Sequence, residues 1–181
     1  MRGLAVLIMI EAHVLDSWTR FPDRQTRQFA YAMVLGGFGA PLFLFLAGVA
    51  VPLSAGSKSR RTGDRSAARA VSRRGLEVFG LAFLFRLQAW VLGWSAARSL
   101  LKVDILNIMG PSIMAAASIW GALTTVKSRL LAFSAAMLAV TFLSPIVRNI
   151  SILSALPDAI EAYLRPVGGR SNFVILPWPG F

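Results

Sequence analysis

The stretch FAYAMVLGGFGAPLFLFLAGVAVPLSAGS (Phe29–Ser57) contains no Asp, Glu, Lys or Arg. Two more uncharged stretches follow, Ile105–Val126 and Leu130–Val147. An apolar run of 18 or more residues is long enough to cross about 30 Å of hydrocarbon as a helix. In a chain of 181 residues, 56% of them hydrophobic, such runs predict membrane spans rather than buried helices of a soluble core.

The pattern predicts an all-α fold, a multispan integral membrane helix bundle with about five complete spans and the start of a sixth. The expected spans are residues 3–18, 29–54, 75–97, 105–126 and 130–147, and the sixth begins near Asn172. We expect one membrane domain over residues 1–181. Because the first span opens almost at residue 1, we expect the chain to be the N-terminal part of a larger domain.

The basic residues indicate how the chain is oriented in the membrane. Seven of the nineteen Lys and Arg residues lie between Lys58 and Arg74, with Asp64 as the only acid among them. Dense Lys and Arg in a short loop between two spans are typical of a cytoplasmic loop. We prefer this explanation of the net charge of +11 to nucleic-acid binding. Attraction of the loop to anionic lipid headgroups is a secondary possibility. We expect a multi-pass protein of the cell inner (plasma) membrane, with the far end of the first span, near His13, towards the opposite face.

The first span carries the chain's only histidine, His13, eleven positions after Arg2. Eleven steps of about 100° return to nearly the same angle, so the two side chains share a helix face. Asp16 follows one turn after His13, and a carboxylate at that spacing can fix the tautomer of an imidazole and raise its basicity. We therefore consider His13 and Asp16 as catalytic candidates. The alternative is a hydrated histidine at a helix end.

Arg86 and Asn107 are the other candidates. Arg86 lies near the middle of an apolar span, where a charged side chain is costly. It could bind a phosphate or carboxylate of a ligand. The alternative is an ion pair with Glu77 or with an acid on another helix. Asp104 is an expected N-cap of the fourth span, and Asn107, one turn later on the same face, could offer its amide to a ligand. One histidine and no cysteine make a metal site unexpected.

Four segments together resemble a known family. Arg2–His13 is similar to the first-span motif of transmembrane acyltransferases, in which a basic residue precedes the active-site histidine. Ala40–Gly48 and Val103–Gly110 resemble segments of the heparan-alpha-glucosaminide N-acetyltransferase catalytic-domain family, and Pro177–Gly180 resembles its Pro-Trp motif.

The resemblance implies transfer of an acyl group, acetyl in the first instance, from acyl-coenzyme A to a glycan or a similar hydroxyl or amine acceptor. His13 would correspond to the catalytic histidine and Arg2 to its paired basic residue. Arg2, Arg86 and Asn107 are then the candidates for binding acyl-coenzyme A, with no metal involved. The expected partners are the lipid bilayer, acyl-coenzyme A and the acceptor, and not nucleic acid. The sequence leaves the oligomeric state open, a homo-oligomer included.

The alternative from another class is a non-enzymatic transporter or permease component, in which Arg86 and His13 line a path for a solute or a proton.

Overall fold

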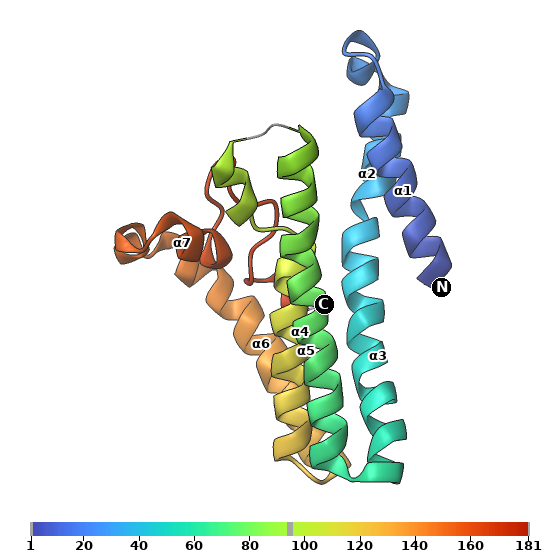
Figure 1. Cartoon of the computed structure of the whole chain (residues 1–181), viewed down its shortest axis with the longest axis vertical. Coiled ribbons are helices and arrows are strands. Elements are labelled where there is room, and N and C mark those ends of the chain that lie inside the picture. The colour runs from blue at the N-terminus through green and yellow to red at the C-terminus, as the bar shows by residue number, and fades with distance from the viewer. Residues whose placement is uncertain (1, 94–95, 181) are drawn as a thin grey trace. The chain divides into compact units, whose positions relative to one another are not determined.

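The computed structural model describes residues 2–93 and 96–180 (Figure 1). It contains two compact units, Met1–Val49 and Ala50–Phe181. The described residues form helices and no strand beyond one isolated bridge, so the predicted all-α class is confirmed. The elements in chain order are α1 Arg2–Trp18, η1 Pro22–Gln25, α2 Arg27–Gly37, α3 Gly39–Thr62, α4 Asp64–Gly93, η2 Ala97–Leu101, α5 Ile105–Ala122, α6 Val126–Asn149, η3 Ser151–Ala155, α7 Asp158–Leu164 and η4 Trp178–Gly180.

Four helical stretches among the described residues are long and apolar enough to cross a membrane. They are Arg27–Thr62, Asp64–Gly93, Ile105–Ala122 and Val126–Asn149, which correspond to the second to fifth expected spans. The first expected span is also helical, as α1, but its 17 residues are one fewer than the 18 of the shortest of these four stretches. The chain is thus a multispan membrane helix bundle.

In the first unit, α1 and α2 pack closely against each other as a hairpin. The tightest approach is at Gly36, where a Cβ atom would lie 2.5 Å from the Cβ of Ala12. Small residues at such a crossing are typical of membrane helices, whose backbones gain contact by approaching closely. Thr26 begins α2 by accepting a hydrogen bond from the Phe29 amide at 3.3 Å. Gly36 therefore fixes α2 against the part of α1 that carries His13.

The second expected span is made of two helices rather than one. α2 ends at Gly37, Phe38 lies between the helices, and α3 begins at Gly39. Pro41 consequently lies in the first turn of α3. Backbone amides of the first turn have no partner within a helix, so a proline there costs no helical hydrogen bond. α3 then continues to Thr62, beyond the expected end of the span at residue 54.

In the second unit, α4 and α5 pack against each other along much of their length. Gly75 of α4 and Gly110 of α5 face each other, so that a Cβ at Gly110 would lie 2.6 Å from the Phe79 Cβ and 2.9 Å from the Gly75 carbonyl oxygen. Neither backbone can retreat without separating the helices. This glycine pair sets the distance between α4 and α5.

Gly110→Ala is expected to destabilise the protein by about 1–3 kcal/mol, because an added methyl group in a filled interface forces the backbones apart. Gly80→Ala is the matched control, since a Cβ there meets nothing within 4 Å. The thermal unfolding midpoint of the purified protein in detergent should fall for the first variant and stay level or rise for the second. Equal midpoints would mean that α4 and α5 are not in such close contact.

The basic stretch 58–74, expected as a loop, is instead the tip of a helical hairpin. α3 ends at Thr62, α4 begins at Asp64, and Gly63 alone makes the turn at φ 81°, a conformation that favours glycine. Ser59 donates a hydrogen bond to Asp64, which pairs with Arg129 of α6 at 2.8 Å. The α3–α4 turn and the α5–α6 turn therefore lie at the same end of this unit, as the expected topology requires.

The expected sixth helix does not begin near Asn172. Residues 172–177 are not helical, and only the short turn η4 follows, at Trp178–Gly180. Pro177 and Pro179 cannot donate the amide hydrogen bonds that a continuing helix needs. The Trp178 ring instead packs edge-on against Phe173, with ring centroids 4.9 Å apart.

Candidate functional site

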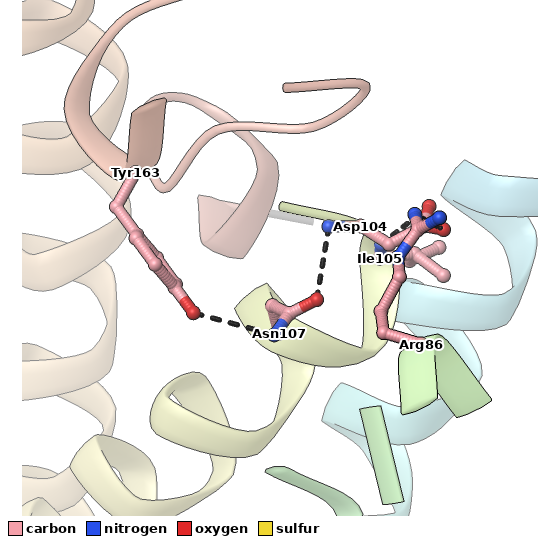
Figure 2. A network of polar contacts seen from close by, with 5 residues as sticks. All are labelled: Arg86, Asp104, Ile105, Asn107 and Tyr163. Carbon is pink, nitrogen blue, oxygen red and sulfur yellow. Dashed lines mark hydrogen bonds and ion pairs between the residues drawn. The ribbon is translucent and has the colours of Figure 1, made fainter. Parts of the chain in front are cut away.

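Arg86 is held by an acid from the neighbouring helix. Its Nη2 lies 2.5 Å from Oδ2 of Asp104, and the Arg86 side chain is only 19% exposed (Figure 2). Such pairing offsets the cost of placing a guanidinium in an apolar span. Of the alternatives open from the sequence, the pair with an acid on another helix is the one observed, while Glu77 pairs with Arg73 and Arg74.

Asp104 also begins α5. Its Oδ1 accepts from the Ile105 amide at 3.0 Å, and its own amide donates to Oδ1 of Asn107 at 3.0 Å (Figure 2). The backbone amide of Asn107 also donates to the Asp104 side chain, and the reciprocal pair of bonds between these two residues is a capping box, which satisfies amides that the first helical turn leaves free. The N-cap prediction for Asp104 is confirmed, and the same carboxylate neutralises Arg86.

Asn107 is almost fully buried, at 1% exposure, and its Nδ2 donates to the Tyr163 hydroxyl at 3.3 Å. One of its two amide hydrogens is thus used, and its oxygen is occupied by the Asp104 amide. Asn107 therefore ties the start of α5 to α7.

Tyr163 is a residue that the sequence did not single out. Burial raises the pKa of its hydroxyl, and the hydrogen bond donated by Asn107 acts in the opposite direction. The hydroxyl is therefore neutral at pH 7 and can itself donate a proton in a hydrogen bond. No local pattern around residue 163 indicates this, because the partner lies 56 positions earlier in the chain.

The segment around Tyr163 is fastened to the start of α5 by backbone pairing. The Val103 amide donates to the Arg170 carbonyl at 2.8 Å, and the Asn172 amide donates to the Val103 carbonyl at 3.0 Å. Beneath this pairing lies an apolar cluster formed by Val103, Ile108 and Ala162, with Tyr163, Val167, Phe173, Ile175 and Trp178 packed against it. Four side chains, those of Arg86, Asp104, Asn107 and Tyr163, thus form one connected polar group, here called the α5 network.

The remaining candidates lie on α1, in the first unit. His13 is exposed, and it has no hydrogen-bond or ion-pair partner among the described side chains. The Asp16 carboxylate pairs with Arg24 at 3.6 Å, and the Asp16 carbonyl also accepts from that guanidinium. Arg2 belongs to α1 by its backbone, and its side chain lies outside the described part of the structure.

The structure thus brings Arg86 and Asn107 together through Asp104, and it gives Asp16 a cationic partner that was not expected. A free imidazole on an exposed helix face can accept a proton from a bound hydroxyl or amine. The α5 network can hold one guanidinium and one neutral phenol in fixed positions. Among the described residues, no three His, Asp or Glu side chains are grouped as metal ligands.

The chain was compared with known protein families, with curated proteins and with solved structures. One family model, described as "Heparan-alpha-glucosaminide N-acetyltransferase, catalytic", matches residues 1–181, the whole of this sequence. No curated protein and no solved structure matches.

Proposed function

We propose that this chain, which belongs to the heparan-alpha-glucosaminide N-acetyltransferase catalytic family, transfers an acetyl or similar acyl group from acyl-coenzyme A to a hydroxyl or amine acceptor such as a glycan. Membership of a family of membrane acyltransferases is the observation that carries the proposal. It also favours an enzyme over the transporter alternative. The exposed imidazole of His13 on α1 supports the same conclusion.

His13 is proposed as the base. Histidine is the side chain that enzymes most often use to transfer a proton near neutral pH. His13 would take the proton from the acceptor O–H or N–H as the acceptor atom bonds to the acyl carbon and the C–S bond breaks. The imidazolium would then return that proton to the departing thiolate. Acyl-coenzyme A supplies the activated thioester carbonyl. In the second version of the proposal, a ring nitrogen of His13 bonds to the acyl carbon as the C–S bond breaks, and the departing thiolate takes the proton that the ring loses. The acceptor atom then bonds to the acyl carbon as the C–N bond breaks, and the proton of the acceptor returns to the ring.

Asp16 is proposed to support His13. Its carboxylate lies one helical turn away and is shared with Arg24, which limits its freedom to move. A carboxylate in this position would stabilise the positive charge that the ring gains while it holds the proton of the acceptor. Asp16 would therefore act through His13, without contact with the acceptor.

Arg2 and Arg86 are proposed to bind the phosphates of acyl-coenzyme A, since a guanidinium matches a phosphate with two parallel hydrogen bonds. Arg86 would have to share its charge with Asp104, which already neutralises it in the structure. Asn107, at 1% exposure, would act by positioning Asp104 and Tyr163.

Binding of acetyl-coenzyme A by the purified full chain tests the proposal, because a transporter component has no need of this compound. We expect saturable heat release in a titration with acetyl-coenzyme A, and weaker binding of the analogue that lacks the 3′-phosphate. The proposal would be wrong if both compounds gave equal and negligible heat and if no acetyl group were transferred to any sugar amine or hydroxyl offered as acceptor.

A further inference from the structure

The first three turns of α4 carry a line of arginines on their outer side. Arg65, Arg69 and Arg73 follow each other at intervals of four and all are exposed. Residues four apart lie on the same side of a helix. We call these three residues the arginine stripe.

The opposite side of the same turns is packed. Ala67, Val71 and Gly75 are buried, and each lies about 200° around the helix from the stripe residue two positions before it. Val71 contacts Val51 and Ala55 of α3 and Ala117 of α5 in an apolar cluster. The stripe therefore points away from the helices that α4 packs against in this unit.

The end of α3 adds more positive charge beside the stripe. Lys58, Arg60 and Arg61 are exposed, and among the described residues none of their side chains has an acidic partner. The only acid of the hairpin tip, Asp64, is held by Ser59 and by Arg129. Within the stripe, Arg73 pairs with Glu77 at 3.5 Å, and Arg65 and Arg69 have no acidic partner among the residues that the structure describes. The tip thus presents several cations whose charge nothing described in the chain neutralises.

The position of the stripe along α4 places it, by helix length and composition, where lipid headgroups are expected. Gly75 lies eleven positions after Asp64, the start of α4, which is about 16.5 Å of helix at 1.5 Å per residue, and the apolar part of the same helix follows. Cations just outside the hydrocarbon on the cytoplasmic side meet the negative surface formed by anionic lipids. Six of the seven basic residues between Lys58 and Arg74 are arginines, whose planar fork suits a phosphate better than a lysine does.

We propose that the arginine stripe and the neighbouring end of α3 bind the phosphate groups of anionic phospholipids. The site is separate from the proposed acyl transfer, and its ligand is a component of the bilayer. The phosphates of coenzyme A have the same chemistry, but they are soluble, so the two sources can be told apart by experiment.

The experiment measures the preference of the purified full chain for phosphatidylglycerol over phosphatidylcholine, from the lipid retained in mixed nanodiscs. Each surface cation contributes about 1 kcal/mol to attraction by an anionic surface, which is about fivefold in binding. Arg65→Gln/Arg69→Gln should therefore lower the preference by about 25-fold in 50 mM salt and by much less in 500 mM salt. Arg148→Gln/Lys102→Gln is the control with the same loss of charge, because these residues lie at the end of α6 and just before the start of α5, away from the hairpin tip. Arg65→Lys/Arg69→Lys should give an intermediate loss.

Two further measurements decide between the outcomes. The first checks that the glutamine variants keep the orientation of the wild type in the membrane. Ser66→Cys is added to each chain, and its labelling by a membrane-impermeant reagent on intact cells is compared. Free coenzyme A at millimolar concentration should leave the lipid preference unchanged. An unchanged preference in the stripe variant, or an equal loss in the control, would overturn the proposal. So would displacement of the lipid by coenzyme A, which would assign the stripe to the acyl donor.

Discussion

Replacement of His13 by alanine is expected to slow acyl transfer by about 10²–10⁴-fold, the usual cost of losing a general base. Affinity for acetyl-coenzyme A should remain close to that of the wild type, because the imidazole is not expected to contact the phosphates. His13→Gln keeps some hydrogen-bonding capacity but no proton acceptor, and it should be almost as slow. The measurement is transfer of labelled acetyl groups by the full chain in a bilayer.

Val14→Ala is the matched control, since Val14 is an exposed neighbour on the same helix and carries no chemistry. Acid quenching during turnover shows whether His13 acts as a base or carries the acyl group itself. Label that stays on the wild-type chain and is absent from His13→Ala would make the histidine an acyl carrier. If both histidine variants transfer acetyl groups at the wild-type rate, the residue is a hydrated histidine at a helix end.

Asp104→Ala should cause the largest loss of stability, because this carboxylate serves both Arg86 and the start of α5. Loss of the cap costs about 1 kcal/mol, and an unpaired arginine in an apolar span costs about 2.5–3.5 kcal/mol. Asp104→Asn retains a capping oxygen, so this variant should lose only the stability that comes from pairing with Arg86. The thermal unfolding midpoint of the purified protein ranks the variants.

The double variant Arg86→Leu/Asp104→Asn removes the charge and its partner together while keeping the cap. Its stability should return close to that of the wild type, as is found when both members of a buried ion pair are replaced. Acetyl-coenzyme A affinity of this stable variant then tests the binding role of Arg86. An affinity equal to the wild type would leave Arg86 as a structural residue. A double variant as unstable as Asp104→Asn would contradict the pairing.

Composition and hydropathy predict the helices well, because span length is set by the thickness of the bilayer. Residues 105–126 and 130–147 are found as α5 and α6 with shifts of a few residues. The break at Phe38 and the helical tip at Gly63 were not predicted. Charge alone does not distinguish a loop from the end of a long helix, and one glycine suffices for the turn.

The polar contacts are less predictable, since they join residues far apart in sequence. The spacing identified Arg86 as a costly charge and Asp104 as a cap, but not that each is the other's partner. Tyr163 meets Asn107 only because the Val103 backbone pairs with residues 170 and 172. Arg24 reaches Asp16 through the turn that follows α1, a geometry that helical periodicity does not describe.

The pair between Arg86 and Asp104 also bears on how the chain enters the membrane during synthesis. α4 reaches the insertion machinery with an arginine in its apolar part, and the compensating carboxylate follows 18 residues later, at the head of α5. An arginine at the centre of a lone span costs about 2.5–3.5 kcal/mol, so α4 alone is a poor candidate for release into lipid. The two helices are better delivered together, as a pair that leaves the translocon only after Asp104 has emerged. From the spacing of this ion pair we therefore expect the two spans to be inserted together.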